Sequence, residues 1–357
     1  MGLLRRREPV ELMVKVEQLR DEFRAAGKDS ILNEALRQGV PLPHGCTVGT
    51  CGTCKAKLVE GKVRELTDSA VALSAEELRA GYILPCQSVA RSPLRLDIPQ
   101  LADLPDHPFV MRKAEIVLQR GLTHDIVELG LSLDGPMEYT AGQYAEIGLP
   151  DQAHLRAYSF SCGPSRRAQD YVSFFIRQMP GGEFTGWLFG DDRTGTVLEC
   201  HGPFGNLWLR PGDGPVLCIA GGSGLGPIKS IVEAARDQEV DREFTVVFGV
   251  RTQRDLYCVG AIEEIGRFWG SRFRFVPILS EEPAGSGWNG ATGFVTEAIG
   301  RLPESVVKGS DAYVCGPPPM VDAVEAQLLS IGVDAGSFHA DRFLDTSGKS
   351  QQQKAPV

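Results

Sequence analysis

The pattern of apolar and polar positions changes its character twice along the chain. In the N-terminal part, residues 30–39 carry apolar side chains at helical spacing, whereas Ala56–Leu58 and Leu94–Ile98 alternate as strands do. From Met111 to about Arg210, short alternating or apolar runs are separated by turn residues, which predicts a small antiparallel barrel. These runs lie at Ala114–Leu118, Ile126–Leu131, Gln143–Ile147, Tyr171–Arg177 and Thr196–Glu199.

The last third of the chain alternates apolar strands with helices. Strands are expected at Val216–Ala220, Phe244–Val250, Phe273–Leu279 and Ala312–Cys315, and helices after Val259, Gly293 and Pro319. Repeated strand–helix units predict a parallel, Rossmann-like sheet, which binds ligands at the carboxyl ends of its strands.

A stretch rich in proline and aspartate, Pro99–Pro108, separates the first part from the barrel and is the expected domain boundary. The chain has 357 residues, which is comfortable for two or three domains. We expect domains at residues 1–103, 104–212 and 213–345, followed by a polar, disordered tail at residues 346–357.

Charge and hydropathy exclude two classes of partner. The net charge of -9 argues against a nucleic-acid binder, because such proteins carry a basic surface that neutralises phosphates. No apolar stretch approaches the ~20 residues that a membrane helix needs. The N-terminal sequence has acids at Glu8 and Glu11, where a signal peptide needs its apolar core, so we expect a cytoplasmic protein.

Cysteine spacing gives the strongest chemical signal. Nine cysteines, an odd number without a secretory signal, favour metal binding or buried thiols over a disulfide framework. Four of them follow the pattern C-x4-C-x2-C with a distant fourth cysteine, which is typical of a plant-type [2Fe-2S] cluster. These are Cys46, Cys51, Cys54 and Cys86. Gly45, Gly49 and Gly52 would let the loop turn tightly and aim its amides at the cluster sulfurs.

Other interpretations of these cysteines remain open. A structural zinc site would be expected to show two C-x2-C pairs instead of one, and four unrelated core cysteines are the second alternative. A Rieske centre needs histidine ligands, and we interpret His44 beside the loop as a packing residue. Four further cysteines are expected to be small buried hydrophobes, namely Cys162, Cys200, Cys218 and Cys258.

The middle segment contains a possible flavin-binding group. The run Arg156-Ala157-Tyr158-Ser159 precedes the pair Gly181-Gly182, which opens a helix carrying Thr185. A guanidinium can pair with a pyrophosphate, an aromatic ring can lie against the isoalloxazine, a hydroxyl can reach a ring nitrogen, and a helix start offers amides to phosphate. Strands also contain Arg, Tyr and Ser for packing alone, so the position of the run between the other motifs carries the interpretation.

Two turns in the last third could bind a nucleotide. The first contains Gly221, Gly222, Gly224 and Gly226 between a strand and an amphipathic helix, where small residues let a phosphate approach. It is not a strict Rossmann fingerprint, because Pro227 replaces the last glycine and no acid follows Phe244–Val250 to bind a ribose. The second turn, Cys315-Gly316-Pro317, ends another strand. A buried cysteine before a turn is its simpler interpretation.

In chain order, PHGCTVGTCGTC, RAYS, PGGEFT, GGSGLGP and CGPPPM resemble the ferredoxin–NADP reductase superfamily with a plant-type ferredoxin fused at its N-terminus. The sequence is similar to the reductase components of bacterial multicomponent oxygenases from about Val14 to Phe343. The resemblance implies a multidomain α+β and α/β protein. Its parts would be a β-grasp [2Fe-2S] ferredoxin domain, an antiparallel β-barrel FAD domain and a Rossmann-like NAD domain.

The resemblance also implies roles for particular residues. FAD would be bound by Arg156, Ala157, Tyr158, Ser159, Gly181, Gly182 and Thr185, and the nicotinamide nucleotide by Gly221, Gly222, Gly224, Gly226, Cys315, Gly316 and Pro317. The implied catalytic residues are Ser159, Cys315, Asp341 and Phe343. Asp341 departs from the family's pattern, which often has glutamate at this position.

The implied activity is that of an NADH:ferredoxin or oxygenase oxidoreductase, which would serve aromatic hydrocarbon catabolism as a monomer. NADH would deliver two electrons to FAD, and the cluster would pass them singly to an oxygenase or an intermediary ferredoxin. The segment GVRTQRDLY, which begins at the end of the strand Phe244–Val250, resembles that of NADH-using relatives, although Arg251 and Arg254 could bind the 2'-phosphate of NADPH. The alternatives are a reductase of a deoxysugar dehydratase, a metal-binding interaction protein and a free-standing NADH oxidase.

An electron leaves most readily where the cluster lies nearest the surface. The partner is therefore expected at the lip of the cysteine loop, around His44, Thr47, Val48 and Thr50. Lys55 and Lys57 would favour an acidic partner and give association a modest salt dependence.

Overall fold

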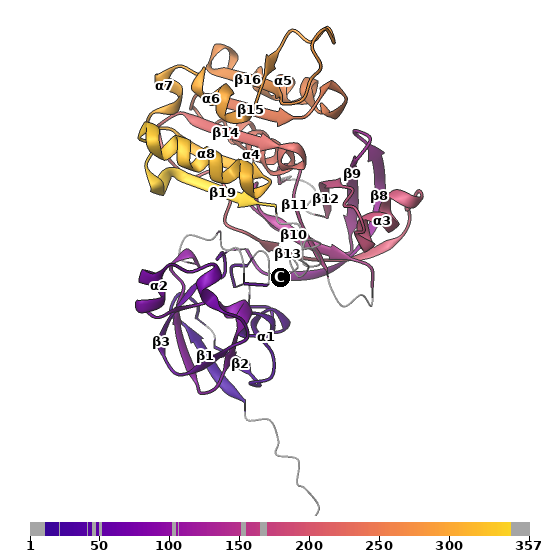
Figure 1. The fold of residues 1–357 in the computed structure, drawn as a ribbon. Coiled ribbons are helices and arrows are strands. Elements are labelled where there is room, and N and C mark those ends of the chain that lie inside the picture. Colours follow the sequence, from indigo (N-terminus) through magenta and orange to yellow (C-terminus); the bar gives the residue numbers. More distant parts are fainter. Residues whose placement is uncertain are drawn as a thin grey trace, which may run out of the picture. The chain divides into compact units, whose positions relative to one another are not determined.

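The computed structural model describes residues 11–20, 22–40, 42–44, 48–49, 52–101, 105, 107–150, 155–164 and 170–343. The chain divides into two compact units. Unit 1 comprises Met1–Phe109 with Phe204–Asn206, and unit 2 comprises Val110–Pro203 with Leu207–Val357 (Figure 1). The predicted tail, residues 346–357, lies outside the described residues.

Unit 1 contains a five-stranded mixed sheet of order β2-β1-β7-β3-β5. Its strands are β1 (Leu12–Val16), β2 (Phe23–Ala25), β3 (Ala56–Glu60), β5 (Tyr82–Ile83) and β7 (Leu94–Asp97), and β4 (Val63–Glu65) pairs with β6 (Ser88–Ala90) in a separate ribbon. Strands β1 and β7 pair in parallel, whereas β1 with β2, β3 with β5 and β3 with β7 pair antiparallel. The ferredoxin-like fold predicted for this part of the chain is confirmed.

Two helices of unit 1 begin at serine caps. Helix α1 (Ile31–Arg37) starts after Ser30, whose side chain accepts a hydrogen bond from the Asn33 amide, and buries Ile31 and Leu32 in the core beside the sheet. Helix α2 (Ala75–Arg79) starts at Ser74 with the full capping box that Glu77 completes. Short 3-10 turns occur at η1 (Ser69–Val71), η2 (Pro85–Gln87) and η3 (Pro99–Leu101).

Unit 2 begins with a six-stranded sheet of order β11-β10-β13-β8-β9-β12, which forms the predicted antiparallel barrel. Its strands are β8 (Val110–Gly121), β9 (Ile126–Leu133), β10 (Tyr144–Gly148), β11 (Arg156–Ser159), β12 (Tyr171–Arg177) and β13 (Val197–Phe204). Helix α3 (Glu183–Gly190) connects β12 to β13. The core is made by alternate residues of these strands, including Phe174, Ile176 and Leu198, together with Phe160 just after β11.

The rest of unit 2 is a parallel sheet of order β17-β16-β15-β14-β18-β19. Its strands are β14 (Val216–Gly221), β15 (Phe244–Val250), β16 (Phe273–Leu279), β17 (Ala291–Thr292), β18 (Asp311–Gly316) and β19 (Phe338–Arg342). The helices are α4 (Leu225–Asp237), α5 (Val259–Gly266), α6 (Val295–Gly300), α7 (Glu304–Val307) and α8 (Pro318–Ile331), with short turns η4 (Gly222–Gly224), η5 (Gln253–Asp255), η6 (Gly270–Arg272) and η7 (Ala335–Ser337).

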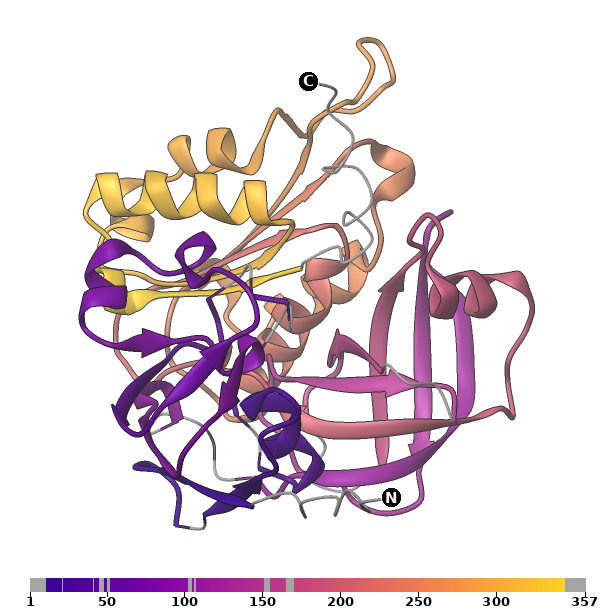
Figure 2. The same cartoon turned by 60° about the horizontal axis from the view of Figure 1, so that its bottom comes forward.

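Helices cover both faces of this parallel sheet (Figure 2). Cys218 and Ala220 of β14 face the cluster that contains α4 and α5, whereas Leu217 and Ile219 face the one that contains α6 and α8. All six residues of β14 are buried, which explains why its sequence is a continuous apolar run.

The pattern of apolar positions does not predict β19. Its residues, FHADR, are all half-buried and mostly polar, because the strand pairs only with β18 at the sheet edge. Among the described residues the longest helix, α8, has 14 residues, and none is long and apolar enough to cross a membrane.

Candidate functional site

Two of the four predicted cluster ligands lie in contact in unit 1. Cys54 comes from the loop before β3 and Cys86 from η2, and their Sγ atoms are 3.2 Å apart. This distance is too long for a disulfide, whose sulfurs lie about 2 Å apart. Both cysteines are 4% exposed. Cys46 and Cys51 lie outside the described residues.

The local backbone fits a tight ligand loop. Gly49 and Gly52 have φ angles of +83° and +71°, in the left-handed region that favours glycine. A Cβ atom on Gly49 would lie 2.6 Å from Cγ of Gln87, next to Cys86 in the chain. The buried thiol pair and these turns therefore suit an iron–sulfur cluster held by thiolates. Gly45 lies outside the described residues.

His44 is a packing residue. It is 4% exposed, its Nδ1 lies 2.8 Å from the Leu42 carbonyl oxygen, and its ring meets Phe204 edge-on with centroids 4.9 Å apart. The expectation that His44 forms part of an accessible docking lip is therefore wrong, because the ring is enclosed. Val48 is half-buried, and Thr47 and Thr50 lie outside the described residues.

The predicted flavin strand is β11, the edge strand of the barrel sheet. Arg156 and Ala157 are exposed, whereas Tyr158 and Ser159 are half-buried. The ring of Tyr158 lies 5.8 Å from that of Phe184 in α3, and burial raises the pKa of the Tyr158 phenol, so it stays neutral. The strand can thus offer a guanidinium, an aromatic ring and a hydroxyl to one ligand.

Helix α3 begins where a phosphate site is predicted. Gly181 has a φ of +71°, and Gly182 caps the helix without a side-chain hydrogen bond, which leaves the first-turn amides available to an anion. The Thr185 hydroxyl accepts a hydrogen bond of 3.1 Å from the Met179 amide. A Cβ atom on Gly182 would lie 2.5 Å from that hydroxyl, so the turn requires glycine.

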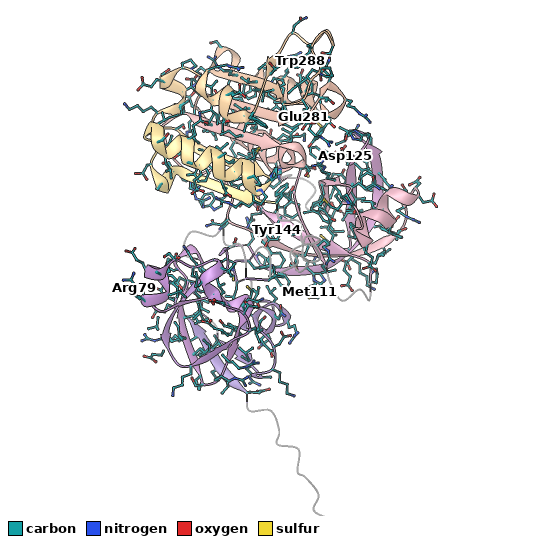
Figure 3. The ribbon with its side chains drawn as sticks, in the orientation of Figure 1. Arg79, Met111, Asp125, Tyr144, Glu281 and Trp288 are labelled. Carbon is teal, nitrogen blue, oxygen red and sulfur yellow. The ribbon has the colours of Figure 1, made fainter. Side chains whose placement is uncertain are left out.

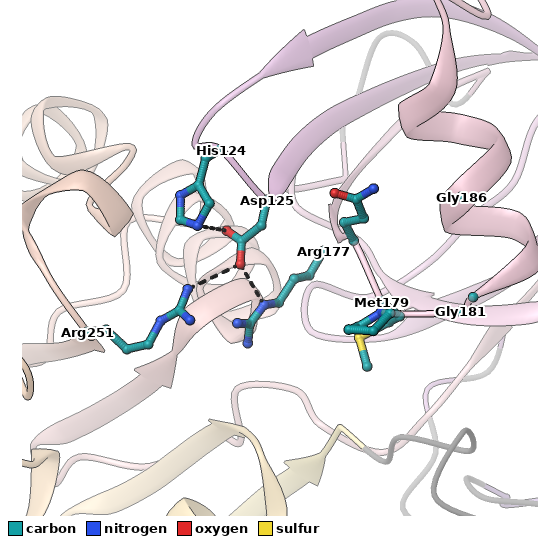
Figure 4. Close-up of a pocket in the computed structure, with 10 residues that line it drawn as sticks. His124, Asp125, Arg177, Met179, Gly181, Gly186 and Arg251 are labelled. Atoms are coloured by element: carbon teal, nitrogen blue, oxygen red, sulfur yellow. Dashed lines mark hydrogen bonds and ion pairs between the residues drawn. The ribbon is translucent and has the colours of Figure 1, made fainter.

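A cavity of about 680 Å³ opens beside this turn (Figure 4). Its wall consists of His124, Asp125, Arg177, Gln178, Met179, Pro180, Gly181, Gly182, Gly186 and Arg251. Most of these residues belong to the barrel, but Arg251 follows β15 of the parallel sheet. His124, Asp125 and Arg177 belong to none of the predicted motifs, and the signal in the sequence was a charged residue, Arg177, at the end of a strand shortly before a glycine turn.

Asp125, labelled in Figure 3, joins the barrel to the parallel sheet at this cavity through the ion pairs drawn in Figure 4. Its Oδ2 atom accepts hydrogen bonds from Arg177 Nε at 3.0 Å and from Arg251 Nη2 at 3.3 Å. Burial opposes ionisation, but the Thr123 hydroxyl and the charge of Arg177 outweigh it and hold the pKa of Asp125 below its ordinary value. Arg251 also bonds Asp255 at 3.1 Å, so its charge is compensated within the protein.

The two predicted nucleotide turns meet at the carboxyl ends of β14 and β18. A Cβ atom on Gly224 would lie 2.3 Å from the Cys315 carbonyl oxygen, and one on Gly221 would lie 2.5 Å from Met320 Sδ. Gly316 has a φ of +154°, and Pro317 precedes α8. Small residues thus let the backbones of the two turns approach each other closely. Their backbone groups can then bind a flat or phosphorylated ligand.

The four predicted catalytic residues are brought together from three strands. Cys315 of β18 pairs with Asp341 of β19, and the Ser159 hydroxyl of β11 donates to Asp341 Oδ2 at 3.4 Å. The amide of Phe343 donates to the Gly316 carbonyl oxygen at 2.9 Å. The end of the flavin strand therefore lies at the edge of the nucleotide sheet.

Two buried groups at this junction have shifted pKa values. Burial raises the pKa of Asp341 to about 6, although the Ser159 hydrogen bond and the charge of Arg342 oppose the shift. Burial, and then the charge of Asp341, raises the pKa of the Cys315 thiol well above its ordinary value. Near neutral pH the site therefore holds a carboxylate that titrates and a thiol that stays protonated.

Family models match the chain in three segments. A 2Fe-2S iron-sulfur cluster binding domain matches residues 14–91, an oxidoreductase FAD-binding domain matches residues 113–208, and an oxidoreductase NAD-binding domain matches residues 218–326. Their order is the order of the three sites described above.

Relatives and solved structures match nearly the whole chain. The xylene/toluene monooxygenase electron transfer component XylA of Pseudomonas putida is 40% identical, with 94% of each chain covered. The reductase component of the naphthalene 1,2-dioxygenase/salicylate 5-hydroxylase systems of a Ralstonia species is 32% identical over 92% of this chain and 97% of the relative.

Two solved structures are similar in fold and sequence. The ferredoxin reductase in carbazole 1,9a-dioxygenase has a TM-score of 0.73 and 31% identity, covering 94% of this chain and 99% of its own. The Amycolatopsis cytochrome P450 reductase GcoB has a TM-score of 0.79 and 31% identity, covering 93% and 98%.

Proposed function

The chain belongs to the family of ferredoxin–NAD(P) reductase components of oxygenase systems, and from this premise we propose that it draws electrons from NADH and delivers them singly to an aromatic hydrocarbon oxygenase or to its intermediary ferredoxin. When bound, the nicotinamide supplies a hydride, FAD accepts it, and the [2Fe-2S] cluster transfers one electron at a time. We also propose that the protein acts as a cytoplasmic monomer.

The observation that carries this proposal is the meeting of β11, β18 and β19 at Ser159, Cys315 and Asp341. A flavin held along β11 and a nucleotide held at the β14 and β18 turns would have their reactive ends at this place. Arg156 would pair with the flavin's pyrophosphate, and Tyr158 would lie against its ring.

The residues at this junction have distinct proposed roles. The Ser159 hydroxyl would reach the flavin ring, with Asp341 fixing its orientation. The protonated Cys315 thiol and the aromatic ring of Phe343 would shape the nicotinamide pocket and keep water out.

In unit 1, Cys54 and Cys86 are proposed as two of the four cluster ligands, with Cys46 and Cys51 completing the set. Buried thiolates next to one another are electrostatically unfavourable unless a cation shares their charge, and an iron–sulfur cluster meets this need. The visible spectrum of the purified protein separates this proposal from a zinc protein, because zinc is colourless.

NADH is the proposed reductant. The carboxylates of Asp125 and Asp255 already bind Arg251, which lowers the attraction of this edge for the 2'-phosphate of NADPH. A further acidic residue, Glu281, is joined to Arg251 through the backbone, since its amide donates to the Arg251 carbonyl oxygen at 2.8 Å. A higher kcat/KM for NADPH than for NADH in steady-state assays would contradict this choice.

The deciding experiment is reconstitution with candidate oxygenases. The protein, NADH and a xylene, naphthalene or phenol oxygenase component are combined, and hydroxylated product is measured against NADH consumed. Tight coupling to one component supports the proposal. Rapid oxygen consumption without any partner would instead indicate a free-standing NADH oxidase.

A further inference from the structure

Helix α4 connects the two halves of the proposed reaction site. It begins at Leu225, inside the glycine turn Gly221–Gly226, and its second and third turns lie against residues 161–163, just beyond the flavin strand β11. Both partners belong to unit 2.

Each residue of the 161–163 segment bonds to α4. Lys229 Nζ donates to the Ser161 carbonyl oxygen at 3.1 Å, and Ser230 Oγ donates to the Cys162 carbonyl oxygen at 2.6 Å. The Gly163 amide donates to Glu233 Oε2 at 2.9 Å. Lys229 and Glu233 also pair with each other at 2.5 Å, so the three helix residues form one network.

This network is shielded from water. Ser230 is fully buried, and the side chains of Lys229 and Glu233 are 14% and 20% exposed. A Cβ atom on Gly163 would lie 3.3 Å from the Ala234 amide nitrogen, so the backbone of this segment packs directly against the backbone of α4. Hydrogen bonds in such a setting hold their geometry more strongly than those on the surface.

The other side of the same segment is fixed to the barrel. The Tyr139 hydroxyl donates to the Cys162 carbonyl oxygen at 3.0 Å, and the hydroxyls of Ser161 and Ser173 lie 2.9 Å apart. A displacement of α4 would therefore strain or break these bonds. Residues 161–163, which we call the joint, are thus bonded to α4 of the parallel-sheet part on one side and to the barrel on the other.

We propose that Lys229, Ser230 and Glu233 are positioning residues that set the distance between the nucleotide turn and the flavin strand. The inference rests on the proposed function. Lys229 follows Gly226 by three residues and Ser161 follows Ser159 by two. A displacement of residues 161–163 relative to α4 would therefore change the distance between the nucleotide turn and the flavin strand. A misplacement of about 1 Å can slow a reaction step on the order of a hundredfold.

The test uses the full-length holoprotein with the variants Glu233→Ala, which removes the acceptor of the Gly163 amide, and Ser230→Ala. Asp237→Ala is the matched control, since it removes a carboxylate from the same helix where, among the described residues, Asp237 bonds only its neighbour Arg236. Stopped-flow spectroscopy measures flavin reduction by NADH and by NADH carrying deuterium at both C4 positions. Amide hydrogen exchange at Gly163 reports the joint itself without NADH.

Both joint variants are expected to slow flavin reduction about tenfold while the KM for NADH changes less than about twofold. The deuterium isotope effect should rise, because the hydride step becomes more limiting. Exchange at Gly163 should accelerate about tenfold in Glu233→Ala, which leaves the Gly163 amide without its acceptor, and stay unchanged in Asp237→Ala. FAD content should equal that of the parent in all three.

Faster exchange at Gly163 with an unchanged rate of flavin reduction would overturn the inference, because the joint would then be structural only. Unchanged exchange would overturn it as well, since the bond to Glu233 would not hold the segment. Failure of the proposed function looks different: the parent protein itself would not be reduced by NADH.

Discussion

Two glycine-rich turns of this protein use glycine for different physical reasons. In the cysteine loop of unit 1, Gly49 and Gly52 have positive φ angles of +83° and +71°. In the nucleotide turn of unit 2, Gly224 has a φ of -60°, which any residue could adopt, yet a Cβ atom there would lie 2.3 Å from the Cys315 carbonyl oxygen. One turn needs the backbone freedom of glycine, and the other needs its small size.

The two turns also differ in what they present to a ligand. The cysteine loop offers side-chain sulfurs, so each ligand residue is irreplaceable and the spacing is visible in the sequence. The nucleotide turn offers backbone atoms and empty space, which many sequences can provide. Substitutions should therefore have an all-or-none effect in the first region and a graded effect in the second.

The largest expected effect is that of Cys86→Ser. Its Sγ lies 3.2 Å from that of Cys54, and a hydroxyl is a poor substitute for a thiolate on iron. We expect loss of the cluster's visible absorption and at least a hundredfold slower electron delivery to the oxygenase. Reduction of a dye that accepts directly from flavin should keep the parent's rate.

The control for this variant is Cys258→Ser, a half-buried cysteine at the start of α5 with no cluster role proposed. It should retain cluster absorption and delivery. If Cys86→Ser abolished dye reduction at unchanged FAD content, the order NADH, flavin, cluster would be wrong.

A graded effect is expected from alanine in the two turns. Gly224→Ala forces the β14 and β18 turns apart and should lower kcat/KM for NADH about tenfold or more, with the cluster spectrum intact. Gly52→Ala places its Cβ 3.3 Å from the Ala72 carbonyl oxygen, a milder crowding than that at Gly224, and costs about 1–2 kcal/mol in backbone strain. It should lower the thermal unfolding midpoint and leave kcat/KM for NADH unchanged.

Equal losses of kcat/KM in the two alanine variants would remove the distinction between conformational and steric glycines. Steady-state kinetics with NADH and a direct flavin acceptor, combined with differential scanning calorimetry, measures both quantities on the same preparations.

The same contrast explains what the sequence could predict. Strand–helix alternation predicted the fold, which is confirmed, and cysteine spacing predicted cluster ligands of which Cys54 and Cys86 lie in contact, because both patterns depend mostly on residues near one another in the chain. The bond between Asp125 and Arg251 was missed, since Asp125 comes from the barrel. The backbone bond from Glu281 was missed because Glu281 follows β16, a neighbour of β15 only in the folded sheet. His44 was misplaced because Phe204, far along the chain, covers its ring.

The nucleotide side contains a titrating group. Burial raises the pKa of Asp341 to about 6, and the ionised carboxylate accepts the Ser159 hydrogen bond more strongly than the protonated acid does. Flavin reduction by NADH should therefore slow about threefold to tenfold as the pH falls through 6, the worth of one hydrogen bond. Asp341→Asn should show a flat profile over the same range in stopped-flow measurements.

Stability gives an independent check on Asp341. The pKa of Asp341 is raised in the folded state. Its carboxyl group therefore contributes fully to the free energy of unfolding below the unfolded pKa of about 4, and this contribution is lost as the pH rises through 6. Asp341→Asn should thus raise the unfolding midpoint relative to the parent more at pH 8 than at pH 5. A pH-independent difference would show that the carboxyl has an ordinary pKa.

The smallest effect concerns the charges beside the cysteine loop. Lys55 Nζ pairs with Glu77 Oε1 at 2.6 Å, and this hydrogen bond, followed by that from the Ser74 amide, holds the pKa of Glu77 below its ordinary value. The pair presents no net charge to a partner, so the double variant Lys55→Gln with Glu77→Gln should change electron delivery less than about 1.5-fold at low salt.

The single variant Lys55→Gln separates this idea from direct docking by Lys55. It leaves the Glu77 carboxylate uncompensated, so delivery to an acidic partner should slow by up to about twofold, with the loss removed by salt as the charges are screened. If Lys55 itself contacted the partner, the double variant would be as slow as the single one. Stopped-flow delivery rates at two ionic strengths distinguish these outcomes, because a compensated pair predicts recovery in the double variant whereas a docking lysine predicts none.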